Sequence, residues 1–159
     1  MDGQTMTDNK TLVVGLGNPI LGDDGVGWRV AEAVKELRPS VEVDCLALGG
    51  LSLMERLVGY DRAIIVDAMH TGHGRTGTVT TFPLSDLPDR SAGHTTAVHD
   101  LSLPTALTLG RQMGAQLPEE ITIVGIEAER VYDFSEELST AVQDAIPVAV
   151  TAVLTAIEA

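Results

Sequence analysis

Three side chains that could do chemistry stand near the ends of apolar stretches: Asp24, Asp67 and His99. Two carboxylates and one imidazole are oxygen and nitrogen ligands of borderline hardness. They suit a divalent transition ion such as nickel or zinc, with one position left open for water or substrate. The same groups could perform acid–base chemistry without a metal, because close carboxylates push each other's pKa values apart. The pattern thus favours a site with Asp24 and Asp67 as catalytic acids and all three residues as metal ligands.

Each of these residues also has a plain structural interpretation. Asp24 could have no other role than to interact favourably with a helix dipole. Asp67 could be an ordinary turn residue, and His99 could make a local hydrogen bond. Burial next to a strand core makes the turn interpretation of Asp67 the weaker one, because a buried carboxylate needs a partner. His94 is the rival of His99, and Glu127, at the end of another core strand, is a possible additional acid.

A glycine-rich stretch, residues 15–27, must position the first acid. It joins an apolar strand to an amphipathic helix, so its glycines allow a tight turn and a close approach of helix to strand. Asp23 is expected to cap this helix and Asp24 to lie in its first turn. A dinucleotide fingerprint would need glycine where Ile20 stands, and two acids would repel a pyrophosphate. A nucleotide-binding oxidoreductase is therefore disfavoured.

Strands and helices are expected to alternate along the chain. An uninterrupted apolar run at 63–66 is typical of a strand buried on both faces of a parallel sheet. Alternation of this kind predicts the α/β class: a three-layer α/β/α sandwich with a mostly parallel sheet of about five strands and helices on both faces. The expected strands are 11–14, 41–45, 63–66, 78–82 and 121–126, and the expected helices are 26–37, 51–58, one that opens at 99–100, and 135–157.

Two further expectations concern the elements. Pro104 is acceptable only in the first turn of its helix, whereas Pro147 should kink the last helix or split it in two. If the strand order resembles 2-1-3-4-5, the first and third strands are neighbours. Asp24 and Asp67 would then face one crevice at the carboxyl edge of the sheet, where ligands bind in such folds.

Composition limits the possible partners. The chain has 159 residues and a formal net charge of −13, which disfavours nucleic acid and anionic membranes. Its length suits one catalytic domain, 11–159, after a flexible leader, 1–10, without a signal-peptide core. No apolar run is expected to span a membrane. The single cysteine, Cys45, excludes an internal disulfide and fits a reducing, cytoplasmic compartment.

The glycine-rich stretch resembles the signature of the hydrogenase maturation proteases, Gly-Leu-Gly-Asn-Pro followed by Asp-Asp-Gly-Val-Gly. The resemblance continues in order through shorter motifs that cover nearly the whole chain after the leader: Gly49-Gly50, Asp67-Ala68, 99–103 and 124–127. Peptidyl-tRNA hydrolases resemble the chain at the first motif alone, and their RNA partner conflicts with the acidic charge.

The resemblance implies an aspartic-type endopeptidase, on a phosphorylase/hydrolase-like sandwich, that removes a C-terminal peptide from the large subunit precursor of nickel–iron hydrogenase. It also implies that Asp24, Asp67 and His99 contact nickel supplied by the substrate, with zinc or cadmium able to take the site in vitro. The first acid is often glutamate in the family, so aspartate here reaches one methylene less far. The alternative function is a non-catalytic, chaperone-like nickel-binding maturation factor of the same fold.

Overall fold

The computed structural model describes residues 9–47, 49–86, 102–129 and 134–159. The strands are β1 (Thr11–Leu16), β2 (Glu42–Leu46), β3 (Arg62–Met69), β4 (Val79–Pro83) and β5 (Glu120–Glu127). The helices are α1 (Val26–Leu37), α2 (Gly50–Leu57), α3 (Leu103–Gln112) and α4 (Thr140–Glu158), with short 3-10 turns η2 (Gly22–Gly25) and η3 (Leu84–Asp86).

One five-stranded sheet runs through the domain in the order β2-β1-β3-β5-β4. The strands β2, β1, β3 and β5 pair in parallel, and β4 pairs antiparallel to β5 at the edge. The predicted α/β class is confirmed, and so is the adjacency of β1 and β3. The order 2-1-3-4-5 is wrong in its second half, because β5 lies beside β3 and displaces β4 to the edge.

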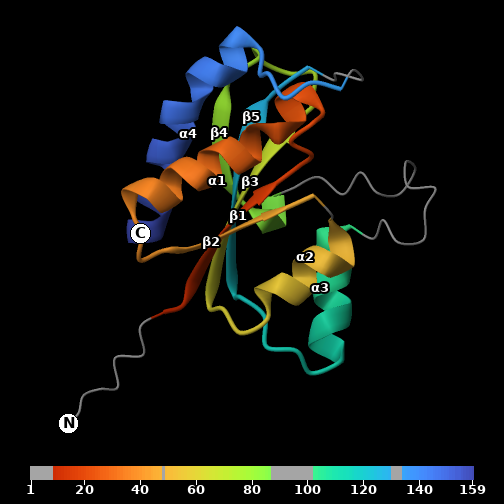
Figure 1. Cartoon of the computed structure of the whole chain (residues 1–159). Helices are drawn as coiled ribbons and strands as arrows, with labels where there is room; N and C mark the ends of the chain where they lie inside the picture. The colour runs from red at the N-terminus through yellow and green to blue at the C-terminus, as the bar shows by residue number, and fades with distance from the viewer. Residues whose placement is uncertain (1–8, 48, 87–101, 130–133) are drawn as a thin grey trace.

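Helices cover both faces of the sheet, α1 and α4 on one side and α2 and α3 on the other (Figure 1). A hydrophobic core lies on each face of the sheet, and strand β3 contributes side chains to both. Ile64 and Val66 pack toward α1 and α4, whereas Ala63 and Ile65 pack toward α2 and α3. All four side chains are at most 2% exposed. The apolar run is therefore buried on both faces, as predicted.

The starts of two helices bear on the predicted boundaries. The described part of α3 begins at Leu103, with Pro104 in the first turn as predicted and Ser102 as N-cap; the predicted opening at 99–100 lies outside the described residues. Helix α4 begins at Thr140 and runs on past Pro147. The predicted split is wrong because Pro147 and the carbonyl it leaves unbonded, four residues earlier, lie on the exposed face, while the opposite face is held by the core.

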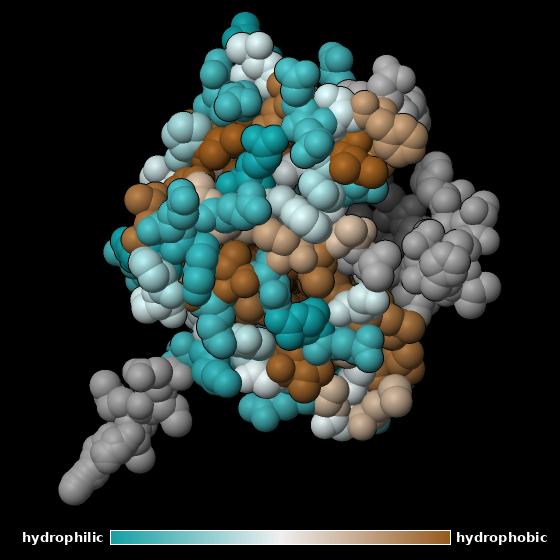
Figure 2. All heavy atoms as spheres, viewed as in Figure 1, coloured by the Kyte–Doolittle hydropathy of each residue, from teal (hydrophilic) through white to brown (hydrophobic). Residues whose placement is uncertain are grey.

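Helix α4 does not fit the expectation that no apolar run is able to span a membrane. By length and composition alone it could cross one. That test is weak evidence, because the core helices of globular proteins pass it too, and α4 packs five side chains into the core: Val142, Ala145, Ala149, Val150 and Val153. Hydrophilic side chains cover most of the face seen in Figure 2, with apolar ones in small groups between them.

Candidate functional site

The glycine-rich turn after β1 is built from contacts that leave no room for a side chain. A Cβ at Gly17 would lie 2.0 Å from the Asp24 carbonyl oxygen, and Gly17 has a φ of +138°. A Cβ at Gly27 would lie 2.4 Å from the Val66 carbonyl oxygen. The start of α1 therefore rests directly on β1 and β3, which brings η2 and its two acids beside the end of β3.

Asp24 is folded back onto this turn. Its Oδ2 accepts a hydrogen bond from the backbone N–H of Asn18 at 2.8 Å. The side chain is partly buried and lies in η2, one turn before α1. The carboxylate is therefore held in a fixed place at the carboxyl edge of the sheet instead of turning freely in solvent.

Asp23, its neighbour, does not cap α1 as predicted. The N-cap of α1 is Gly25, which makes no side-chain hydrogen bond. The Asp23 carboxylate is 3% exposed and accepts hydrogen bonds from the backbone N–H and the hydroxyl of Ser139, at 2.6 and 2.8 Å. The 3-10 turn directs it away from α1 toward the start of α4, so it ties the glycine-rich turn to a segment 116 residues away.

Backbone hydrogen bonds strengthen this tie. Gly22 N–H donates to the Ser135 carbonyl at 2.7 Å, and Ser135 N–H donates to the Ile20 carbonyl at 2.8 Å. The turn that carries Asp24 is thus clamped by the segment that precedes α4. Such support from outside the reacting groups is what keeps a site in its productive geometry.

Asp67 lies near the end of β3, at the same carboxyl edge of the sheet as Asp24 and next to the end of β1. Burial raises its pKa to about 8, and the negative charge of Asp24 adds to the rise; the backbone N–H of Ala68 acts in the opposite direction. The pKa therefore lies close to neutral pH, as expected for a carboxyl that shares a buried site with a second acid. The structure brings together the two predicted catalytic acids.

Glu127 plays a structural part. Its carboxylate accepts hydrogen bonds from Thr71 N–H at 3.1 Å, from the Thr71 hydroxyl at 2.5 Å and from Gly72 N–H at 3.2 Å. All three donors belong to the connection that follows β3, so Glu127 fastens that connection to β5. Its oxygens are already engaged there, and this argues against the interpretation of Glu127 as an additional site acid.

The predicted histidines cannot be placed, because His94 and His99 lie outside the described residues. Within the described ranges, no three His, Cys, Asp or Glu side chains form a group that could hold a metal ion. The metal-binding trio of Asp24, Asp67 and His99 therefore stays a prediction. His70, which the structure does describe, pairs its Nδ1 with the Ala128 carbonyl at 2.9 Å.

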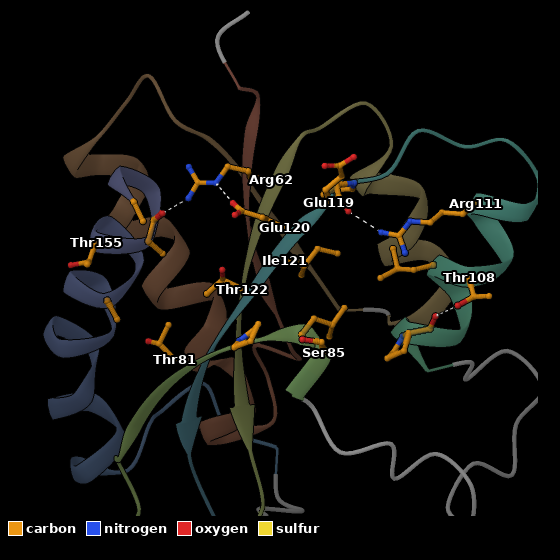
Figure 3. A pocket seen from close by; sticks show the side chains of 18 residues that line it. Arg62, Thr81, Ser85, Thr108, Arg111, Glu119, Glu120, Ile121, Thr122 and Thr155 are labelled. Atoms are coloured by element: carbon orange, nitrogen blue, oxygen red, sulfur yellow. Dashed lines mark hydrogen bonds and ion pairs between the residues drawn. The ribbon is translucent and has the colours of Figure 1, made fainter.

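The described residues line cavities at both ends of the strands. One, of about 340 Å³, lies beside Glu127 and His70. A small one, of about 180 Å³, adjoins Asp67 at the carboxyl edge. A larger one, of about 890 Å³, opens at the amino edge between α3 and α4, over the start of β5 (Figure 3). The larger cavity contains neither Asp24 nor Asp67. The two acids and the cavity of about 890 Å³ therefore lie at opposite ends of the strands.

Sequence comparison relates the chain to one family. A family model described as hydrogenase maturation protease matches residues 10–156. The HupD hydrogenase expression/formation protein of Rhizobium leguminosarum bv. viciae is 28% identical over 144 residues, 89% of this chain and 70% of that protein. The hydrogenase 2 maturation protease of Escherichia coli is 28% identical over 123 residues, 76% of this chain and 74% of that protein.

Solved structures agree. The hydrogenase maturating endopeptidase HybD of E. coli superposes with a TM-score of 0.72 at 27% identity, over 94% of this chain and 92% of that one. A hydrogenase 2 maturation peptidase from a Thaumarchaeota archaeon gives a TM-score of 0.63 at 30% identity, over 93% and 97%. The similarity covers the whole framework, beyond the first motif shared with peptidyl-tRNA hydrolases. The chain belongs to the hydrogenase maturation protease family.

Proposed function

We propose that this peptidase removes a C-terminal peptide from the large subunit precursor of a nickel–iron hydrogenase, in the cytoplasm, after nickel has been inserted. The observation that carries the proposal is the pairing of Asp24 and Asp67 at the carboxyl edge of the sheet, where Asp24 raises the pKa of Asp67. Membership in the maturation protease family supports the hydrolytic activity and the hydrogenase substrate.

The two acids would perform aspartic-type chemistry. A water molecule attacks the scissile carbonyl carbon while Asp67 accepts its proton; the carbon–nitrogen bond then breaks, and Asp67 returns the proton to the departing amine nitrogen. In the metal-free protein Asp67 has a pKa of about 8, so this carboxyl can hold or release a proton near neutral pH. Asp24, anchored by Asn18 N–H, orients the water and stabilises the charge that develops.

Nickel enters this scheme with the substrate. Asp24, Asp67 and His99 would contact the nickel of the loaded precursor, so that only a finished hydrogenase site is cut. The two carboxylates on one edge fit part of the oxygen and nitrogen donor set that a borderline divalent cation prefers. Zinc or cadmium would compete for the same donors in vitro. A nickel-bound precursor would also offer Lewis-acid polarisation of the scissile carbonyl.

A processing assay tests the proposal. The purified protein is mixed with nickel-loaded and nickel-free large subunit precursor from the same cell, and the intact mass of the precursor is measured. We expect trimming of the loaded form only, lost in Asp24→Asn and Asp67→Asn and retained in Asp144→Asn, an exposed acid on α4. An uncut loaded precursor that nonetheless binds the protein would instead support the non-catalytic maturation factor.

A further inference from the structure

Two large apolar side chains are exposed beside the turn that carries Asp24. Phe134 is 80% exposed and Ile20 is 47% exposed. An apolar side chain that is exposed alone is ordinary on a protein surface, whereas adjoining ones at the border of a functional site are typical of an interaction surface. Burial of both against a partner would remove a large apolar area from water.

The two residues adjoin each other although they are far apart in the sequence. A parallel bridge pairs Leu21 with Ser135. Ser135 N–H donates to the Ile20 carbonyl at 2.8 Å, and Gly22 N–H donates to the Ser135 carbonyl at 2.7 Å. Side chains alternate between the two sides of an extended chain, so the preceding residues, Ile20 and Phe134, project together on the side opposite to the bridged pair. They form one apolar surface, the clamp patch.

The clamp patch is fixed relative to the catalytic acids. Asn18 N–H donates to Asp24 Oδ2 at 2.8 Å, and the side-chain oxygen of Asn18 accepts a hydrogen bond from Ile20 N–H at 3.1 Å. One residue thus holds both Asp24 and the start of the patch. A surface on such a fixed backbone loses little conformational entropy on binding. It is also continuous with the edge at which the precursor would be cut.

The described charged side chains next to the patch are mainly carboxylates. Glu136 and Glu137 follow it along the chain and are exposed, and Asp24 and Asp67 lie at the same edge of the sheet. Arg29 is nearby, and its guanidinium donates to the Glu136 carbonyl at 2.8 Å. A precursor that carries divalent nickel complements this charge. A second copy of this chain, with a net charge of −13, would bring like charges together.

We propose that the clamp patch is a docking surface for the folded body of the hydrogenase large subunit precursor, with Ile20 and Phe134 as its anchors. The occupant is an apolar hollow on that subunit, bordered by basic side chains and separate from the residues at the cut. The inference rests on the proposed function, because it takes the same precursor as the partner. It adds a second point of recognition, of the kind in which a few apolar anchors inside a polar rim supply most of the binding energy.

Binding of the nickel-free precursor tests the proposal without cleavage. Phe134→Ser removes the larger anchor, and Ile20→Thr removes the other while it keeps a β-branched side chain. We expect the Kd of the double variant to rise about 10- to 100-fold, with the urea unfolding curve unchanged. Met113→Ser is the matched control, because Met113 is 78% exposed but caps the far end of α3. Equal Kd values for the double variant and Met113→Ser would overturn the proposal, as would absence of wild-type binding.

Processing of the loaded precursor gives a second readout. The double variant should lower kcat/KM by a similar factor and leave kcat within about twofold, because neither substitution removes a catalytic acid. An equal loss of kcat would show that the substitutions act on the acids, and it would overturn the docking role.

Charge reversal tests the chemistry of the rim. Glu137→Lys should raise Kd about 3- to 10-fold at low ionic strength and much less at high ionic strength, because it repels a basic border and salt screens exposed charges. Glu36→Lys, exposed near the end of α1, makes the same change in net charge away from the patch and should leave Kd nearly unchanged. Equal effects of the two variants would refute a basic border.

The outcomes separate this inference from the proposed function. Binding that depends on Ile20 and Phe134, without cleavage of the loaded precursor, would refute the hydrolytic function and leave the docking surface in place. Cleavage by the double variant with the wild-type kcat/KM would refute the docking surface alone. A wild-type dimer that Phe134→Ser converts into a monomer would assign the patch to a second copy and overturn the proposal.

Discussion

The two edges of the sheet hold cavities of opposite character. At the carboxyl edge a cavity of about 180 Å³ adjoins a carboxyl whose pKa is raised to about 8 by burial and by a second acid. At the amino edge the cavity is about 890 Å³, and both arginines that line it are engaged by oxygen acceptors. Arg62 donates to the Ile157 and Ala156 carbonyls and pairs with Glu120 at 3.2 Å, and Arg111 donates to the Pro118 carbonyl (Figure 3).

The difference shows that volume is a poor guide to the site in this fold. On the amino edge Arg62 pairs with Glu120 of β5 and donates to two carbonyls of α4, so it holds the ends of β3, β5 and α4 together, which is a structural task. Among the described residues, the carboxyl edge instead keeps two acids close together with no ion pair to either, an arrangement that costs stability and is characteristic of functional sites. Parallel strands also deliver their ligand-binding loops to that edge. Four predictions follow from this contrast, in order of decreasing effect.

Removing either acid at the carboxyl edge should have the largest effect. Asp67→Asn and Asp24→Asn remove proton transfer and charge stabilisation, so we expect processing of the loaded precursor to slow by about 10²- to 10⁴-fold. Thr155→Trp, which fills the larger cavity at the amino edge, should leave the rate within about twofold of wild type. A rate loss from Thr155→Trp in a folded protein would reverse our assignment of the two edges.

Two glycines at the carboxyl edge should differ in how much a substitution lowers stability. Gly17→Ala places a Cβ 2.0 Å from the Asp24 carbonyl oxygen at a φ of +138°, so we expect the free energy of unfolding to fall by about 2–4 kcal/mol. Gly49→Ala, whose Cβ meets nothing within 4 Å, is the control; because Gly49 is the N-cap of α2, it should lower it by no more than about 1 kcal/mol. Urea unfolding measures both. Equal losses would contradict the packing described for the glycine-rich turn.

Asp67 should make the metal-free protein less stable as the pH rises. Its pKa is about 8 when folded and about 3.9 when unfolded, so between these values the folded state holds the extra proton. The contribution of Asp67 to the free energy of unfolding is fully present below about pH 4. It is lost as the pH rises toward 8, by at most about 1.4 kcal/mol per pH unit. Relative to Asp67→Asn, wild type should lose about 2 kcal/mol from pH 5 to pH 7; a constant difference would refute the raised pKa.

The clamp between the glycine-rich turn and α4 should have the smallest effect. Ser139→Ala removes the hydroxyl that donates to Asp23 at 2.8 Å. Because the Ser139 side chain makes no capping hydrogen bond to α4, the expected loss of about 1–2 kcal/mol in unfolding free energy comes from the unpaired Asp23 oxygen. Thr151→Ala, exposed on the same helix, serves as control. Indistinguishable unfolding curves for the two variants would show that the clamp adds no stability.

Much of the fold follows from local pattern. The five predicted strands appear where alternating or continuous apolar residues indicated them, and the doubly buried β3 is an example. The meeting of Asp24 with Asp67 was also predictable, because both follow strands that a parallel sheet places side by side. The placement of His99 was not tested, since it lies outside the described residues.

Other features depend on residues distant in the chain. The sequence by itself determined the positions of the strands and the two acids, because side-chain periodicity and turn chemistry act within a few residues. Only the tertiary structure decided that Asp23 binds Ser139 and that β4 is the outermost strand, antiparallel to β5. It also decided that α4 continues through Pro147 and that a cavity remains beside Asp67. These outcomes depend on how whole faces pack together, and packing between distant segments leaves no local pattern.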